Sequence, residues 1–156
     1  MRLALFQPEI PQNTGTLLRL GACLNVPIDI IEPCGFIMSD KNLKRAGMDY
    51  LKNAVFKKHS SWHAFLERLE QQEPTPRLLL LTPQASTHYI DFTFKKDDVL
   101  MVGRESNGVP EEVFKQCTAH LKISMMPETR SINVALAAAM VLGEALRQTH
   151  LFPPSS

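Results

Sequence analysis

Three short segments of the sequence carry polar residues in patterns that suit the binding of a charged ligand. Residues 13–19 place an asparagine and an arginine at the two ends of a leucine-rich stretch. Residues 103–110 hold a single carboxylate between two glycines. Residues 130–133 bring an arginine, a serine and an asparagine to the start of an apolar run. Amide, hydroxyl, carboxylate and guanidinium groups of this kind bind and orient cofactors and phosphates.

Two of these segments also have an ordinary structural explanation. Gly103 and Gly108 suit a turn from a strand into a helix, and Ser131 or Asn133 can cap a helix. Alone, each segment is weak support for a ligand site. The sequence also lacks the glycine-rich phosphate loops of common nucleotide-binding folds and the motifs of serine and zinc hydrolases, so any cofactor site must be built differently.

The arginines are harder to explain by structure alone. Arg130 precedes a predicted buried helix, and a guanidinium in that position needs an anionic partner, either Glu105 or a phosphate. Arg19 either extends from an apolar helix to water or takes part in a site, in which case Glu105 is also a candidate to hold it in place. The sequence leaves both alternatives open for Arg19.

The composition excludes several classes of protein. The 156 residues are 44% hydrophobic and 21% charged, with a formal net charge of +1, as in an ordinary globular domain. Charge therefore names no partner, and any nucleic-acid contact must come from a local patch. His59 and His63 have no evident third ligand, so we expect solvated surface histidines and no metal site.

Cysteine usage and hydropathy indicate where the protein acts. Cys23, Cys34 and Cys117 show no disulfide or zinc spacing, so we expect reduced, mostly buried thiols. The longest strongly apolar run, residues 134–142, is too short to span a bilayer, and no secretory signal opens the chain. These features predict a cytoplasmic protein without a membrane contact.

Short apolar runs alternate with helical patterns along the chain. Strands are predicted at residues 2–6, 27–31, 55–57, 78–81, 99–102 and 121–123. Helices are predicted at residues 16–24, 39–46, 62–69, 110–116 and 133–147. The alternation predicts a single α/β domain over residues 1–156 with a mostly parallel sheet, whose ligand site lies in the loops after residues 81, 102 and 123.

The predicted helices have identifiable starts. We expect Asn13 or Thr14 to cap the first helix, Ser61 to cap the third, and Pro110 to be the first residue of the fourth. The last helix is apolar almost all round, so we expect it to be buried on more than one side, including in a subunit interface.

Together, the three segments resemble the motifs of the SPOUT superfamily of RNA methyltransferases. The N-x-G-x-x-x-R motif is matched by residues 13–19, the G-x-E-x-x-G-x-P motif by residues 103–110, and the S-x-N motif by residues 131–133. The resemblance covers nearly the whole chain and is closest to the minimal single-domain members that act on tRNA. The chain departs from close relatives at positions that include Pro83, Ser124, Val134 and Ala135, and at Arg104, where a proline is common and the arginine can add a phosphate contact.

The resemblance implies a fold, a reaction and a set of residues. The fold is an α/β domain with a C-terminal deep trefoil knot that binds S-adenosylmethionine and forms a homodimer. The reaction is methylation of the ribose 2′-hydroxyl of the wobble nucleotide, cytidine or uridine, in the anticodon stem-loop of tRNA, leucine tRNAs in particular, with S-adenosylhomocysteine as product and no metal. The implied catalytic residues are Asn13, Arg19, Glu105 and Asn133. The implied cofactor contacts are Leu81, Thr82, Gly103, Gly108, Ile123, Met125 and Ser131.

Contacts to the RNA and two competing functions complete the expectations. The candidate RNA contacts are Lys41, Lys44, Arg45 and Arg130, with Lys57 and Lys58 beside them. A purely solvated surface is an equally good explanation of the lysines. The competing functions are 2′-O-methylation of ribosomal RNA and a non-catalytic RNA-binding role that retains the fold.

Overall fold

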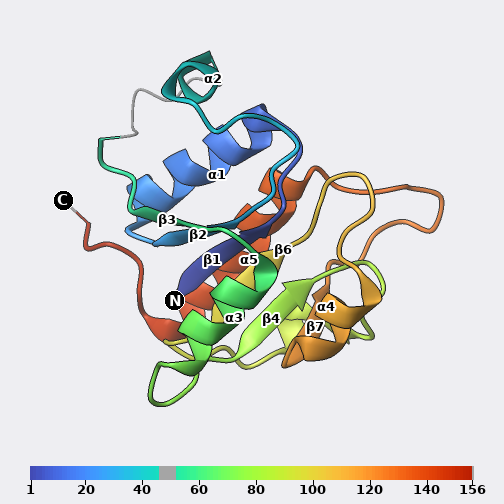
Figure 1. The fold of residues 1–156 in the computed structure, drawn as a ribbon. Helices are drawn as coiled ribbons and strands as arrows, with labels where there is room; N and C mark the ends of the chain where they lie inside the picture. The colour runs from blue at the N-terminus through green and yellow to red at the C-terminus, as the bar shows by residue number, and fades with distance from the viewer. Residues whose placement is uncertain (46–51, 156) are drawn as a thin grey trace.

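The computed structural model describes residues 1–45 and 52–155, and its strands form one sheet (Figure 1). All strand pairings in this sheet are parallel, and the order across it is β3–β2–β1–β6–β4–β7–β5. The prediction of a parallel α/β sheet is confirmed. The strands are β1 (Arg2–Phe6), β2 (Ile28–Ile31), β3 (Phe56–His59), β4 (Leu78–Leu81), β5 (Thr87–His88), β6 (Val99–Val102) and β7 (Ala119–Lys122).

Helices connect the strands on both sides of the sheet. The helices are α1 (Pro11–Leu24), α2 (Asp40–Arg45), α3 (Trp62–Glu70), α4 (Glu111–Gln116), α5 (Val134–Thr149) and the 3₁₀ helix η1 (Tyr89–Asp91). Lys44 and Arg45, two of the predicted RNA contacts, end α2, and their side chains lie outside the described residues. The predicted end of that helix at residue 46 also lies outside them.

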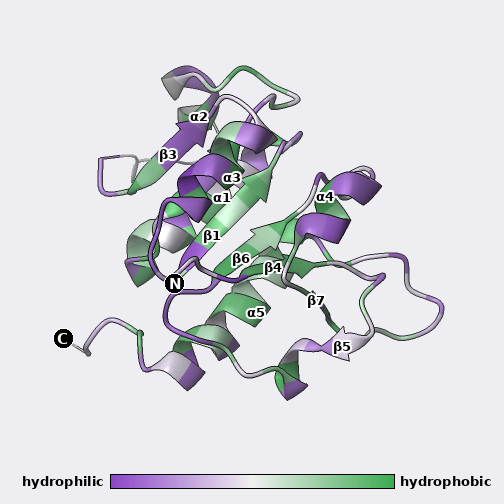
Figure 2. Ribbon diagram, turned by 60° about the horizontal axis from the view of Figure 1, so that its bottom comes forward, coloured by the Kyte–Doolittle hydropathy of each residue, from purple (hydrophilic) through white to green (hydrophobic). Residues whose placement is uncertain are grey.

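Two hydrophobic cores sandwich the sheet. One core lies between the sheet and α1, α2 and α5, where Leu18, Leu43 and Leu142 are buried. The other lies between the sheet and α3 and α4, where Phe65 and Val113 are buried. Figure 2 shows apolar central strands, hydrophilic residues on α1 and α4, and a largely apolar α5. The continuous apolar runs of β1, β4 and β6 are explained by this burial on both faces.

The helix ends confirm some predicted caps and correct others. The Ser61 hydroxyl accepts a hydrogen bond from the backbone N–H of Ala64 at 3.1 Å, as predicted. The prediction that Asn13 or Thr14 caps α1 is wrong, because the helix begins at Pro11 and Ile10 is its cap residue. Proline is favoured in the first turn because its fixed φ suits a helix and its missing N–H is not needed there.

Three smaller predictions also need correction. Pro110 is the cap residue of α4 and not its first helical residue. The last predicted strand, at residues 121–123, instead runs from Ala119 to Lys122. The two-residue strand β5 was not predicted, because Thr87–His88 is too short to give an apolar run and pairs only with β7.

His59 is not the surface residue that the sequence indicated. It is 4% exposed, its ring lies 2.7 Å from a carboxylate oxygen of Asp29, and it packs edge-on against Phe65. His63 is exposed and lies within ion-pair distance of Glu67. The error arose because β3 continues to residue 59 and turns the His59 side chain under α3.

The remaining features concern cysteines and hydropathy. Cys117 is buried, Cys34 is half-buried and Cys23 is exposed, so the expectation of mostly buried thiols is wrong for Cys23. Across residues 1–45 and 52–155, no helix combines the length and apolar character needed to cross a bilayer.

Candidate active site

A cavity of about 790 Å³ opens beyond the carboxyl ends of β4, β6 and β7. This is the edge of a parallel sheet at which ligands usually bind, and the three loops predicted to form a site all line it. The starts of α1 and α5 close its remaining side. Ten of the residues implied by the resemblance line the cavity, namely Asn13, Leu81, Thr82, Gly103, Glu105, Gly108, Ile123, Met125, Ser131 and Asn133.

The loop after β6 is folded tightly on itself by its two glycines. The backbone of Arg104 and that of Gly108 exchange hydrogen bonds of 2.9 and 3.0 Å. Gly108 has φ of +63°, a conformation that favours glycine. A Cβ atom on Gly103 would lie 2.8 Å from the backbone Cα and carbonyl carbon of Gly108, so a side chain there would force the loop open. Both glycines therefore shape one wall of the cavity.

Glu105 binds the start of α1. One of its carboxylate oxygens accepts from the backbone N–H of Glu9 at 2.8 Å, and the other accepts from the N–H of Ile10 at 3.3 Å and from the Asn13 amide at 3.4 Å. Ile10 has no side-chain oxygen to cap the helix, and Glu105 binds the N–H groups of the two residues just before it, where negative charge also suits the positive end of the helix dipole. The position of Glu105 thus couples the second motif to the first.

Asn133 couples the third motif to the same place. Its side-chain oxygen accepts from the backbone N–H groups of Ala135 and Leu136, which confirms it as the cap of α5. Its side-chain nitrogen donates to the Asn13 oxygen at 3.0 Å. A continuous chain of hydrogen bonds therefore runs from Glu105 through Asn13 to Asn133, across residues far apart in the sequence.

Glu9 was not predicted as part of the site. Its carboxylate accepts from the backbone N–H of Ser106 at 3.1 Å and from the Ser106 hydroxyl at 2.7 Å. Since Glu105 binds the backbone of Glu9 in return, the loop after β1 and the loop after β6 are tied in both directions. The available signal was its place directly after an apolar strand, at the edge where the other loops meet.

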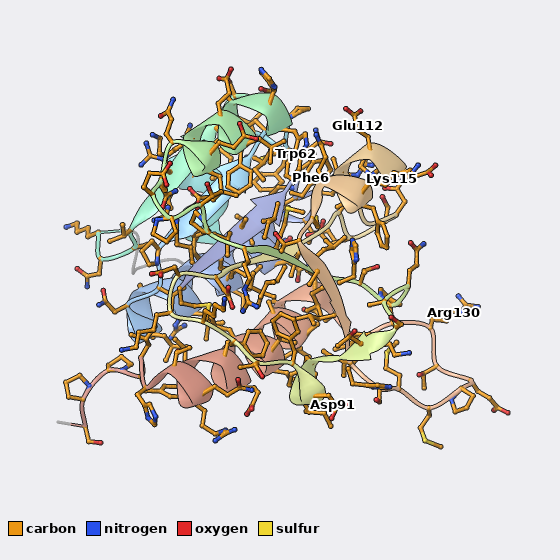
Figure 3. All side chains as sticks on the ribbon, turned by 90° about the horizontal axis from the view of Figure 1, so that it is seen from below. Phe6, Trp62, Asp91, Glu112, Lys115 and Arg130 are labelled. Atoms are coloured by element: carbon orange, nitrogen blue, oxygen red, sulfur yellow. The ribbon has the colours of Figure 1, made fainter. Side chains whose placement is uncertain are left out.

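The arginines do not follow the predictions in full. Arg130 lines the cavity, but it is exposed and forms no ion pair with Glu105; in Figure 3 its side chain extends outward from the loop before α5. Arg19 is exposed on α1 and does not line the cavity of the single chain. Arg104 does line it, at a position where the sequence departs from the motif and where a phosphate contact was one expectation.

The predicted RNA contacts outside the loops lie elsewhere. Lys41 is exposed on α2, and Lys57 and Lys58 are exposed on the edge strand β3. None of the three lines the cavity. The structure therefore separates the lysines from the residues that surround the cavity.

The fold and the cavity define a class of protein. A parallel α/β sheet with a ligand site beyond its strand ends, walled by backbone-rich loops, is typical of enzymes that use a small organic cofactor. Among the described residues, no group of three His, Cys, Asp or Glu side chains is placed to hold a metal ion. The chain belongs to the SpoU rRNA Methylase family, which matches residues 1–143.

One relative and one solved structure are similar to this chain over nearly its whole length. The chain is 57% identical to a tRNA (cytidine(34)-2'-O)-methyltransferase from Beijerinckia indica subsp. indica, over 94% of this chain and 90% of that protein. It is similar to a solved structure described as giving structural insights into the 2-OH methylation of C/U34 on tRNA, with a TM-score of 0.87, 39% identity and coverage of 94% of both chains.

A more distant structure shares the fold. This is the SpoU methyltransferase AviRb from Streptomyces viridochromogenes in complex with AdoMet, with a TM-score of 0.85 and 21% identity. The match covers 95% of this chain but only 60% of AviRb. The similarity therefore shows a shared fold over part of AviRb.

Proposed function

We propose that this chain methylates the ribose 2′-hydroxyl of nucleotide 34 of tRNA, a cytidine or a uridine, with S-adenosylmethionine as methyl donor and S-adenosylhomocysteine as product. The observation that carries the proposal is the chain of hydrogen bonds from Glu105 through Asn13 to Asn133, which joins the three motif segments at one cavity. The substrate is taken from the 57% identical relative, which has nearly the same length.

The cavity suits a cofactor of this size. Its volume of about 790 Å³ lies within the usual range of small-molecule sites. The close approach of Gly103 to Gly108 leaves backbone groups rather than side chains on one wall, as a cofactor held by main-chain hydrogen bonds requires. The proposed cofactor contacts are Leu81, Thr82, Gly103, Gly108, Ile123, Met125 and Ser131.

On the acceptor side of the cavity, we propose that the side chains position the ribose hydroxyl rather than remove its proton. When bound, S-adenosylmethionine supplies a methyl carbon for in-line displacement by the ribose oxygen, so the protein must align that oxygen. The Asn13 and Asn133 amides hold each other in orientation, and Glu105 holds Asn13 from the other side. These neutral amides are placed to donate to and accept from the ribose hydroxyl.

Arg19 is proposed to act on the RNA rather than on the hydroxyl proton. A guanidinium stays protonated at neutral pH and is a poor base, whereas it binds phosphate well. We expect Arg19→Ala to abolish methylation and to leave the fold unchanged by circular dichroism. Full activity of that variant would remove Arg19 from the mechanism.

A homodimer is part of the proposal. Helices α1 and α5 pack against each other, and apolar side chains just before α1 and on the first half of α5 are exposed: Ile10 by 41%, Leu136 by 62% and Met140 by 44%. Such a surface is typical of a subunit interface. We expect Leu136→Asp to convert a dimer to a monomer in sedimentation experiments, and an unchanged mass would place the interface elsewhere.

A C-terminal deep trefoil knot is also proposed. Its support is that β4 lies between β6 and β7 in the sheet although β6 follows β4 in the chain, while the loops after all three strands meet at one cavity. Pulling the chain by its ends would test the knot. A knotted chain stops short of the extension of about 3.3–3.6 Å per residue that an unknotted chain reaches.

The RNA contacts and the location follow from the substrate. We propose that the anticodon stem-loop, in leucine tRNAs in particular, is bound through Arg130 and through basic residues of α2 and β3. The three cysteines are unpaired, which suits a cytoplasmic enzyme. The basic residues concerned are Lys41, Lys44, Arg45, Lys57 and Lys58.

One experiment separates this function from its competitors. Labelled S-adenosylmethionine is incubated with the protein and with total tRNA or ribosomal RNA from which the modification is absent, and the labelled nucleotide is mapped. Label at nucleotide 34 of tRNA supports the proposal, label in ribosomal RNA supports the sister activity, and no label in either supports a binding role. The distant neighbour AviRb, at 21% identity, indicates the fold alone and does not favour the ribosomal substrate.

A further inference from the structure

Arg104 has an unusual environment for a half-buried arginine. Its Nε donates to the Gly108 carbonyl at 3.2 Å, and its guanidinium carbon lies 5.7 Å from the ring centroid of Phe6. Among the described residues, its two terminal nitrogens have no hydrogen-bond partner and no carboxylate lies within ion-pair distance. The side chain of this cavity-lining residue therefore offers unused donors.

The other half-buried arginines of the described chain are both paired. Arg2 binds Asp29 through two hydrogen bonds of 2.8 and 2.9 Å. Arg77 binds Asp98 through two hydrogen bonds of 2.7 Å. A guanidinium that is partly removed from water without an anion is unfavourable, so the exception at Arg104 calls for a ligand that brings the anion.

We propose that Arg104 binds an oxyanion of a reactant, and that this oxyanion is a phosphate of the tRNA backbone beside the methylated nucleotide. The inference rests on the proposed function. The planar guanidinium presents paired N–H donors that match two phosphate oxygens, so the contact both attracts and orients the RNA. Arg104 thereby sets the position of the acceptor ribose rather than taking part in the displacement.

The position of the guanidinium favours the RNA over the carboxylate of the cofactor. Arg104 reaches over Phe6, at the end of β1, and Phe6 does not line the cavity. In Figure 3, Phe6 lies beside Trp62, between α3 and α4. The proposed cofactor loops include those after β4 and β7, on the other side of β6. An oxyanion at Arg104 thus lies on the β1 side, where Asn13 is placed for the acceptor ribose.

The test compares Arg104→Gln and Arg104→Lys with Arg68→Gln, which removes one exposed positive charge from α3 away from the cavity. The tRNA affinity is measured over a series of salt concentrations, and the S-adenosylmethionine affinity is measured by calorimetry. For Arg104→Gln we expect about ten- to hundredfold weaker tRNA binding and a salt slope smaller by about one. The Lys variant should keep the slope and lose part of the affinity, because it keeps the charge without the paired donors.

Each result decides the proposal. The proposal is supported if Arg104→Gln binds tRNA more weakly with a smaller salt slope and keeps its cofactor affinity, while Arg68→Gln keeps the tRNA affinity of the wild type. If Arg104→Gln loses only cofactor affinity, the proposed phosphate contact is wrong and Arg104 instead binds the carboxylate of the cofactor. No change in either affinity, or equal losses in Arg68→Gln, overturns the site. Because binding needs no turnover, wild-type protein that binds tRNA without methylating it would contradict the proposed function and leave this test intact.

Discussion

Charged side chains are paired differently at the two ends of the parallel strands, which are called here the amino-terminal edge and the carboxyl edge of the sheet. Near the amino-terminal edge, Asp29 and Asp98 are 2% and 1% exposed, and each is held by an arginine through two hydrogen bonds. At the carboxyl edge, the carboxylate of Glu105 binds backbone N–H groups and an amide, while Arg104 has no carboxylate. Carboxylates and arginines thus pair with one another at the amino-terminal edge, whereas Glu105 and Arg104 at the carboxyl edge do not.

The difference separates support from function. A buried carboxylate paired with a guanidinium carries no net charge that could attract a ligand. Loss of such a pair lowers the free energy of unfolding. A carboxylate that binds a helix start fixes loops without cancelling the nearby positive charge, which remains available to an anion. We therefore expect substitutions at the amino-terminal edge to lower stability and those at the carboxyl edge to lower binding and turnover.

The largest effect is expected for Asp29→Ala. The substitution leaves Arg2 and the buried His59 without their shared acceptor, and removing one partner of a buried ion pair typically costs about 3–5 kcal/mol. The free energy of unfolding in urea measures this loss. Asp91→Ala, at an exposed site labelled in Figure 3, is the control and should change it by no more than about 0.5 kcal/mol. A loss below about 1 kcal/mol for Asp29→Ala would contradict the structural role of this edge.

Gly103→Ala should act on the other edge. The added Cβ would lie 2.8 Å from the backbone of Gly108, so the loop must open, at a cost of about 1–3 kcal/mol. We expect S-adenosylmethionine to bind at least about tenfold more weakly, which calorimetry measures. Gly143→Ala is the matched control, since nothing lies within 4 Å of its Cβ position on α5. Equal cofactor affinity in both variants would show that this wall does not bind the cofactor.

Glu105→Gln tests the coupling between motifs with a smaller change. The amide keeps the shape but loses the charge that binds the start of α1, a loss of about 1–2 kcal/mol. We expect kcat to fall more than the cofactor affinity, because Asn13 loses its fixed orientation. Glu9→Gln should show the same pattern more weakly, since an amide oxygen can still accept from Ser106.

The control for this pair is Glu112→Gln. Glu112 is exposed in the first turn of α4, so its substitution removes a charge without touching the cavity (Figure 3). If Glu112→Gln lowers kcat as much as Glu105→Gln, the effect is one of general charge and not of the hydrogen bonds to α1.

The same comparison explains how much the sequence could predict. The apolar runs of β1, β4 and β6 have one physical cause, burial on both faces, and so they mark the strands directly. The motifs placed Asn13, Glu105 and Asn133 in the site, and all three line the cavity.

What the sequence could not predict is which polar groups meet. Nothing local indicates that Glu105 binds the backbone of Ile10, or that His59 turns inward to Asp29. Both contacts join residues that are distant in the chain, so only the folded sheet brings them together. Arg104 is a similar case, because the missing partner that marks it is a property of its surroundings and not of its type.

The smallest expected effect concerns Cys34, whose thiol reports on the carboxyl edge. Burial, together with the charges of Glu32 and Glu105 that Lys58 partly offsets, raises the pKa of Cys34 from 9.0 to about 11. Since the folded pKa lies above the unfolded value, this thiol stabilises the fold below about pH 9, and that contribution is lost as the pH rises towards about 11.

The pH at which iodoacetamide labels Cys34 measures this pKa, with mass spectrometry to identify the site and circular dichroism to verify the fold at each pH. We expect the labelling midpoint to move to lower pH in Glu105→Gln, because one negative charge that disfavours the thiolate is gone. The exposed Cys23 serves as the reference in the same sample. An unchanged midpoint would mean that the charge of Glu105 is already screened from Cys34, and the carboxyl edge would then be less distinct from the amino-terminal edge than the hydrogen bonds indicate.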